Sequence, residues 1–333
     1  MAVYAWTVCA CLSLLIGGYY MKKSGLLFKL GFPIGYFLYA KTSLGYFYHQ
    51  KRVKKRPASS APHSKVEPVA VDDSIVIYPV PYLEDNYAYL VVNEKTKRAV
   101  AVDPAHHAVL LGALEKYGVT LVGVLVTHKH WDHAGGNYEL RKTFPHVPIY
   151  GGRKDLPAGT THFVDPGVDI FIEEMNFHAI WTPGHTVGHI VYFLKSTTPP
   201  CLFSGDHLFI GGCGKIFEDN PEVMFQSLQA IKELPSDTLI FPGHEYSWSN
   251  LQFALIFDPH NVNVQKKLDN IKKLRLKRQA TAPAVLSEEL QYNPFLRTDS
   301  VALKETLKLK ANVSQVDVLR KLRQEKDKFK AAA

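Results

Sequence analysis

Hydrophobic residues in the central part of the chain form a succession of short apolar runs. Runs of this length favour strands over helices, and the unbroken run Leu121–Val126 predicts a strand that is covered on both faces. The other predicted strands are Ile75–Val80, Tyr87–Val92, Ala99–Val102, Ile170–Ile172, Phe177–Trp181, Ile190–Leu194, Cys201–Ser204 and Thr238–Phe241.

Two segments of this region, and most of the chain after Ser249, show the spacing of amphipathic helices instead. In Pro221–Leu234 the residues Met224, Leu228 and Ile231 recur at helical intervals. The other predicted helices are His107–Tyr117, Leu251–Phe257, Val264–Arg278, Ala302–Leu309 and Val316–Lys328. The pattern therefore predicts an α/β domain followed by a small helical domain.

The composition agrees with a globular core, but the charge is unevenly distributed. Of the 333 residues, 46% are hydrophobic and 21% are charged, which is ordinary for a folded protein. The net charge of +8 combines a basic N-terminal part, an acidic middle and a basic C-terminal part, and residues 1–66 contain no Asp or Glu. The four cysteines are too few and too scattered for a disulfide framework, which fits a reducing compartment.

The segment Ala2–Met21 has no charged residue and is roughly as long as a helix that spans a bilayer. Lys22 and Lys23 follow it directly. A cleaved signal peptide would carry basic residues before the apolar stretch, and this chain has none there. A buried helix fits the extreme N-terminal position less well. We therefore predict a single-pass membrane anchor.

The basic residues that follow the apolar segment predict its orientation. A basic cluster lies on its C-terminal side, namely Lys51, Arg52, Lys54, Lys55 and Arg56, which predicts that the catalytic domain faces the cytosol. The mitochondrial membrane is one candidate for the membrane. Such a cluster next to an apolar segment suits an anionic leaflet, and we do not expect nucleic acid as a partner. The apolar stretch 26–48 lies on the membrane or forms part of a hairpin, and residues 57–70 predict a linker.

The densest group of ligand-type side chains follows the predicted strand Leu121–Val126. The spacing HxHxDH places three imidazoles and a carboxylate within six residues, on His128, His130, Asp132 and His133. Alternate residues of an extended segment point to the same side, so the first two histidines can reach one metal ion. After a turn, the other two residues can reach a second. Imidazole and carboxylate together suit zinc, iron or manganese.

Three further residues each follow a predicted strand and a glycine: His185, Asp206 and His244. Sheet ends are where α/β folds build their sites. Taken singly, either histidine would more often be a surface residue, and the aspartate would more often be a turn or cap residue. Together with the HxHxDH segment they predict one shared two-metal site. Of the histidines that do not share this position, only His189 is expected to support the ligands.

HxHxDH followed by a distant His, Asp and His resembles the metallo-β-lactamase superfamily. Within it, about residues 75–330 resemble the glyoxalase II, or hydroxyacylglutathione hydrolase, family. The motifs that carry this resemblance are Asp85–Tyr87, Thr127–Gly136, Gly211–Lys215, Gly243–Tyr246, Tyr292–Phe295 and Arg323–Phe329.

The resemblance implies an αββα sandwich with a C-terminal helical domain. It implies two divalent metal ions, most often zinc, one on His128, His130 and His185, the other on Asp132, His133 and His244, with Asp206 bridging. It also implies that Lys215, Tyr246, Arg323 and Lys326 contact glutathione, and Phe217 stands where the family usually has a tyrosine. The expected parts are an anchor (1–23), a basic and aromatic juxtamembrane segment with linker (24–70), a catalytic domain (71–257) and a helical substrate-binding domain (258–333).

Together with this resemblance, the ligand-type residues predict a metal-dependent hydrolase. It would cleave a glutathione thioester, such as an S-2-hydroxyacylglutathione, through a metal-bound hydroxide. Asp132 and Asp206 are the expected catalytic carboxylates. The thiolate leaves easily, and the basic C-terminal part suits a substrate with two carboxylates. Two alternatives stay open. One is another reaction on the same fold, namely phosphoester or lactam hydrolysis or persulfide oxidation. The other is a membrane-anchored regulatory or binding protein with a weak site.

Overall fold

The computed structural model describes residues 34–40 and 42–331. Contacts between residues divide the chain into two units, Met1–Lys51 and Arg52–Ala333, and helix α3 (Ser43–Lys55) runs across the division. Within these described residues, no helix is both long enough and apolar enough to cross a membrane. The predicted anchor Ala2–Met21 lies outside them.

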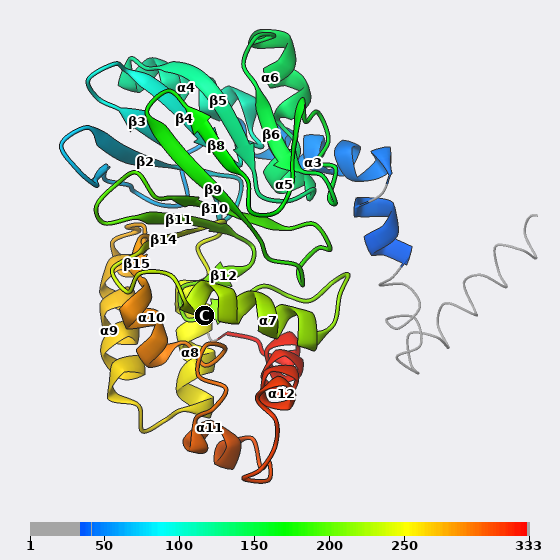
Figure 1. Ribbon diagram of the computed structural model, residues 1–333, viewed down its shortest axis with the longest axis vertical. Helices are drawn as coiled ribbons and strands as arrows, with labels where there is room; N and C mark the ends of the chain where they lie inside the picture. The colour runs from blue at the N-terminus through cyan, green and yellow to red at the C-terminus, as the bar shows by residue number, and fades with distance from the viewer. Residues whose placement is uncertain (1–33, 41, 332–333) are drawn as a thin grey trace, which may run out of the picture. The chain divides into compact units, whose positions relative to one another are not determined.

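Two sheets form the centre of the unit Arg52–Ala333 (Figure 1). The seven strands of the first sheet lie in sequence order: β1 (Val69–Ala70), β2 (Ile75–Tyr82), β3 (Asn86–Asn93), β4 (Arg98–Val102), β5 (Thr120–Val126), β6 (Ile149–Gly152) and β7 (His162–Val164). The second sheet has the order β15-β14-β11-β10-β9-β8, formed by β8 (Asp169–Ile172), β9 (Met175–Trp181), β10 (Ile190–Leu194), β11 (Cys201–Gly205), β14 (Leu239–Pro242) and β15 (Ala284–Val285). A short ribbon of β12 (Leu208–Phe209) and β13 (Gly212–Cys213) follows β11.

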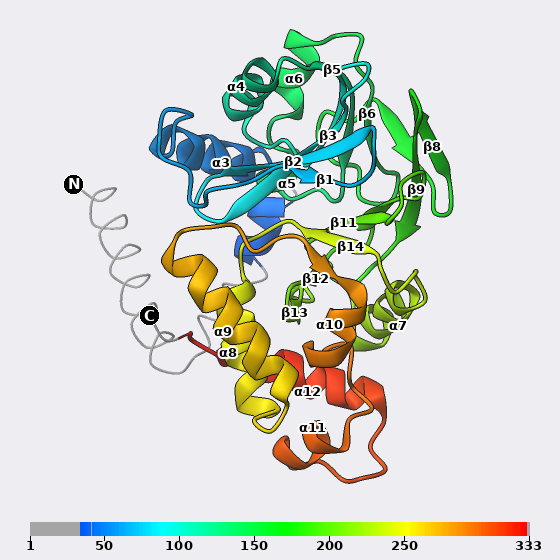
Figure 2. The same cartoon turned by 90° about the vertical axis from the view of Figure 1, so that its left-hand side faces the viewer.

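Helices cover the outer faces of both sheets, as Figures 1 and 2 show. On the side of the first sheet lie α4 (His107–Tyr117), α5 (Trp131–Ala134) and α6 (Asn137–Thr143). On the side of the second sheet lie α7 (Pro221–Lys232), α8 (Ser247–Phe257), α9 (Val262–Leu276), α10 (Leu286–Tyr292), α11 (Val301–Thr306) and α12 (Gln315–Lys328). The expected α/β fold with a C-terminal helical region is confirmed.

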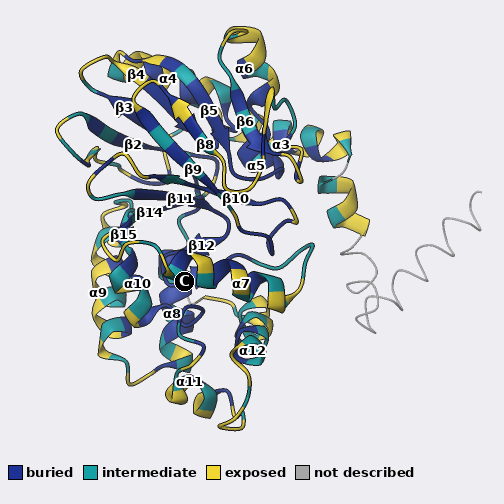
Figure 3. Cartoon of the chain, viewed as in Figure 1, coloured by how far each residue is buried: buried dark blue, intermediate teal, exposed yellow. Residues whose placement is uncertain are grey.

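Hydrophobic clusters fill the spaces between these layers, and Figure 3 shows buried residues concentrated in the strands. Strand β4 illustrates why its sequence is apolar throughout. Val100 and Val102 point into the cluster between the two sheets, whereas Ala99 and Ala101 point into the cluster under α4 and α6. Because successive side chains of a strand alternate between faces, a strand buried on both sides needs an unbroken apolar run.

Strand directions bring the ends of three strands of the second sheet to one edge. Strand β11 is antiparallel to β10, which is antiparallel to β9, and β14 is parallel to β11. Strands β9, β11 and β14 therefore end at the same edge. In the first sheet β4 and β5 are parallel and also end together. The residues predicted to hold metal follow β5, β9, β11 and β14.

The segment predicted to be a linker is bound to the unit Arg52–Ala333 at its centre. Ser64 is fully buried, and its hydroxyl accepts hydrogen bonds from Arg275 (2.8 Å) and Tyr87 (3.1 Å). The backbone of Lys65 exchanges hydrogen bonds with Arg278 (2.6 Å) and Ala280 (2.8 Å). The segment around Ser64 and Lys65 therefore forms a strap across the fold, bonded to residues that lie far away in the sequence.

Candidate metal centre

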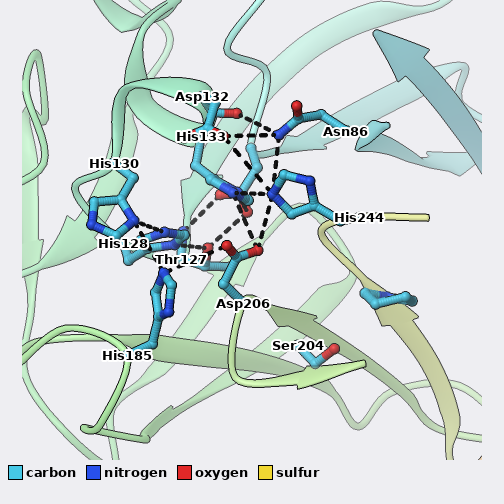
Figure 4. Close-up of polar contacts among 12 residues, drawn as sticks. Asn86, Thr127, His128, His130, Asp132, His133, His185, Ser204, Asp206 and His244 are labelled. Carbon is cyan, nitrogen blue, oxygen red and sulfur yellow. Dashed lines mark hydrogen bonds and ion pairs between the residues drawn. The ribbon is translucent and has the colours of Figure 1, made fainter. Parts of the chain in front are cut away.

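All seven residues predicted as metal ligands converge in the structure at the strand ends (Figure 4). The first group of donor atoms consists of three imidazole nitrogens. Nδ1 of His130 lies 3.0 Å from Nε2 of His128 and 3.0 Å from Nε2 of His185. Donor atoms at this mutual distance can share a single metal ion.

The second group lies on the other side of the Asp206 carboxylate. Nε2 of His133 lies 3.2 Å from Nε2 of His244, and Oδ2 of Asp132 lies 3.9 Å from the same nitrogen of His244. These three residues form another set that can hold a metal ion.

The carboxylate of Asp206 faces both groups at once. Its Oδ2 lies 3.5 Å from Nε2 of His185, while its Oδ1 lies 3.3 Å from Nε2 of both His133 and His244. Oδ1 is buried and accepts no well-aligned hydrogen bond in spite of these neighbours. A buried carboxylate oxygen that lies among imidazole nitrogens without such a bond fits a cation as its partner. The donor set therefore suits two divalent ions.

Hydrogen bonds from the outer ring nitrogens hold four of the five imidazoles in place. Nδ1 of His133 lies 2.9 Å from Asp103, and Nδ1 of His244 lies 2.8 Å from Asp85. Nδ1 of His185 lies 2.8 Å from the carbonyl of Lys215, and Nδ1 of His128 lies 3.0 Å from the hydroxyl of Thr127. An imidazole fixed through one nitrogen presents the other to a metal, so these contacts orient the ligands.

The two groups differ in their electrostatics. In the first group, burial lowers the pKa of His130 to about 3, and burial also lowers the pKa of His128 and of His185. In the second group, burial opposes a charge on His133, but the carboxylates of Asp206 and Asp103 outweigh it and raise its pKa to about 10. The second group therefore lies in a more negative environment than the first.

Sequence reasoning missed Asp103 as a member of the site. Besides His133, its buried carboxylate accepts hydrogen bonds from the backbone N–H (2.8 Å) and the hydroxyl (2.7 Å) of Thr127. The signal was present, because Asp103 directly follows the predicted strand Ala99–Val102. Asp85 and Asn86 were noted only as part of a motif, and the amide of Asn86 lies 3.4 Å from Oδ2 of Asp132.

His189, expected to support the ligands, does contact one of them. Its Nε2 accepts a hydrogen bond from the backbone N–H of Asp206 (3.2 Å), and its Nδ1 lies 3.0 Å from the hydroxyl of Thr182. The ring also stacks on His128, with centroids 5.0 Å apart. His189 thus fixes the backbone that carries the shared carboxylate.

Of the four residues expected to contact substrate, Tyr246 and Lys215 contact ligand histidines, and Arg323 and Lys326 bond to β13 and α8. The ring of Tyr246 stacks on His244, with centroids 4.7 Å apart and an angle of 10°. Arg323 donates to the carbonyl of Cys213 (2.9 Å), two residues before Lys215. Lys326 donates to the carbonyl (3.1 Å) and the hydroxyl (3.2 Å) of Ser249.

An aromatic ring covers the first group. The ring of Phe217 lies 5.1 Å from that of His185 and 5.6 Å from that of His130, in edge-to-face orientation. Lys215 places its ammonium 5.2 Å from the same ring. The site is therefore apolar on this side and basic beyond it.

Replacing Asp103 by asparagine should weaken binding of divalent cations about 10–100-fold, because His133 would lose the carboxylate that orients it. Zinc titration against a chelator measures the effect. Asp165→Asn is the matched control, since Asp165 is exposed and pairs with Arg153 on the surface. Unchanged zinc affinity in Asp103→Asn would show that Asp103 has no part in the centre.

Comparison with known proteins agrees with this geometry. The family model for the metallo-β-lactamase superfamily matches residues 82–244, and the model for the hydroxyacylglutathione hydrolase C-terminus matches residues 245–329. The cytoplasmic hydroxyacylglutathione hydrolase of Arabidopsis thaliana is 41% identical over 258 residues, which cover 76% of this chain and 99% of that protein. The hydroxyacylglutathione hydrolase-like protein of Gallus gallus is 44% identical over 252 residues, which cover 74% of this chain and 88% of that protein.

Among solved structures, ETHE1 from Myxococcus xanthus matches with a TM-score of 0.49 and 22% identity, over 72% of this chain and 93% of that one. The full-length match to the plant enzyme is what assigns the family. The donor set and the two family models agree with it. The chain is a metal-dependent hydrolase and belongs to the hydroxyacylglutathione hydrolase, or glyoxalase II, family of the metallo-β-lactamase superfamily.

Proposed function

We propose that this protein hydrolyses a glutathione thioester, such as an S-2-hydroxyacylglutathione, with two divalent cations, most often zinc. The observation that carries the proposal is the position of Asp206, whose two carboxylate oxygens face different groups of imidazoles. Relatives of the chain carry the name hydroxyacylglutathione hydrolase. Iron and manganese are the alternatives to zinc, because they accept the same nitrogen and oxygen donors.

In this proposal His128, His130 and His185 hold one cation, and Asp132, His133 and His244 hold the other. The carboxylate of Asp206, whose oxygens face both groups, would be shared between the two cations. Bound cations supply a Lewis acid for the thioester carbonyl and lower the pKa of water towards neutrality. The residues of the chain would orient the cations and shield them from bulk solvent, since six of the seven donor residues are buried.

Tyr246 is a donor for the substrate. Burial, together with the nearby carboxylates of Asp85 and Asp206, raises the pKa of its hydroxyl well above the usual value. The hydroxyl therefore keeps its proton at neutral pH and can donate a hydrogen bond. Because its ring stacks on His244, its position is tied to the second group.

Two basic residues on α12 would bind the carboxylates of glutathione. Arg323 and Lys326 lie three residues apart and so share one face of the helix. Burial, and then the charge of Arg323, lowers the pKa of Lys326 to about 7. A substrate carboxylate at this place would favour the charged form of Lys326, so substrate binding and protonation support each other.

Asp206→Ala and His130→Ala should each abolish hydrolysis, and the first should also remove both cations, because Asp206 faces both groups. Metal analysis together with turnover of a panel of substrates tests this. The panel contains a glutathione thioester, a phosphoester, a lactam and a persulfide, and only the thioester should be cleaved efficiently. His146→Ala is the control, since His146 is exposed. Near-normal turnover by metal-depleted Asp206→Ala protein would exclude the two-cation mechanism.

Replacing both Arg323 and Lys326 by alanine should raise KM for a glutathione thioester much more than it lowers kcat. Contacts that are equally present in the ground and transition states change binding rather than chemistry. Each lost charged hydrogen bond costs about 1.5–3 kcal/mol, so the pair should raise KM by on the order of a hundredfold or more. Lys328→Ala is the control, because its side chain is 69% exposed. A double variant with wild-type KM would mean that the substrate is not a glutathione conjugate.

We also propose that Ala2–Met21 anchors the protein in a membrane, with the hydrolase facing the cytosol. The uncharged run and the lysines that follow it support this. The protein should stay with membranes in alkaline carbonate, and a variant without residues 2–21 should be released. In cells whose plasma membrane alone has been made permeable, added protease should cut the hydrolase. Release of the full chain by carbonate would contradict the anchor.

A further inference from the structure

A positive side chain from the segment that precedes both matched family models reaches the second group of donors. Arg52 lies in the last turn of α3, well before residue 82, where the first family model begins. Its Nη1 lies 3.6 Å from Oδ2 of Asp132, and its Nη2 lies 2.6 Å from Oε2 of Glu84. The side chain is largely buried, with 22% exposed.

The oxygen that Arg52 approaches is the one that faces the metal centre. Oδ2 of Asp132 is the carboxylate oxygen 3.9 Å from Nε2 of His244, and the amide of Asn86 lies 3.4 Å from it. A cation held by the second group would therefore share this oxygen with a guanidinium. A positive charge next to a carboxylate reduces its attraction for a second cation, and it also repels that cation directly.

The chain around Arg52 fixes it in this position. Four residues later, Nε of Arg56 donates to the carbonyl of Leu83 (3.1 Å), and the carbonyl of Arg56 lies 3.0 Å from Nε2 of His106. Arg52 and Arg56 thus hold the pair Leu83 and Glu84. The next two residues of the chain, Asp85 and Asn86, contact His244.

We propose that Arg52 is a positioning residue that weakens cation binding at the second group of this chain. The inference rests on the two-cation centre proposed above. It goes beyond that centre because the residue comes from outside both matched family models. The charge at the end of α3 thereby lowers the affinity of the hydrolase for the second cation. A change in the position of this helix end would change that affinity.

The test is zinc titration of the full chain, freed of metal, in competition with a chelator. In Arg52→Gln one of the two dissociation constants should fall about tenfold, since a full positive charge close to a divalent cation is removed. The other constant should not change. Arg52→Met serves as a second neutral variant if Arg52→Gln folds poorly. Arg52→Lys keeps the charge and should stay close to wild type.

Two comparisons separate charge from helix docking. Arg56→Gln removes a contact of the same helix end without removing the charge next to Asp132, so it should not strengthen zinc binding. In an Asp132→Ala background, Arg52→Gln should strengthen zinc binding less than it does in wild type, because the shared carboxylate is gone and only the direct repulsion of the cation remains. If Arg52 only docked the helix end, Arg52→Gln would likewise fail to strengthen zinc binding.

The outcomes distinguish this inference from the proposed function. If wild type and Arg52→Gln each bind two zinc ions, and the two proteins have the same pair of dissociation constants, then the role of Arg52 alone is overturned. Weaker binding in Arg52→Gln would also overturn it. If wild type and both neutral variants bind a single zinc ion at saturation, then the two-cation centre is wrong, and the inference falls with it.

Discussion

The buried carboxylate of Asp206 is the constraint on which the rest of the structure depends. An ionised carboxylate out of water costs several kcal/mol unless positive partners surround it. The chain meets this requirement with strand directions that bring four strand ends to one place. The backbone must also come very close here. Gly205 has φ of +48°, and a Cβ on Gly214 would lie 1.8 Å from the carbonyl oxygen of Asp206. Both glycines therefore fit the close backbone path on either side of Asp206.

The elements predicted well from the sequence are those whose burial pattern is local. The bounds of α4 and β10 agree with the predictions to the residue, because an amphipathic helix and a strand buried on both faces carry their own signal. Strands β1, β6, β7, β12, β13 and β15 were missed. The pair β15, Ala284–Val285, is a strand only because it bonds to β14, more than 40 residues earlier. The buried strap around Ser64 escaped for the same reason, since its partner Arg275 is 211 residues away.

The candidate site was more predictable than the connections between its elements. Ligand-type residues at strand ends can be recognised from the sequence because the strands themselves can be recognised. Asp103 carried this same signal, but a single aspartate after a strand is more often a turn residue, and only its contact with His133 distinguishes it. Arg52 carried no signal of this kind. In sequence it is one of a cluster of basic residues, and only the fold places it next to Asp132.

The charges behind the imidazoles give the two groups unequal attraction for cations. In the first group, the outer nitrogens of His128 and His185 meet a hydroxyl and a carbonyl. In the second group, those of His133 and His244 meet carboxylates, which makes the imidazoles stronger donors. The second group also contains a carboxylate of its own, on Asp132. Without an opposing charge it would hold its cation far more tightly than the first. The guanidinium of Arg52 next to Asp132 adds a positive charge to the second group alone, and so reduces this difference.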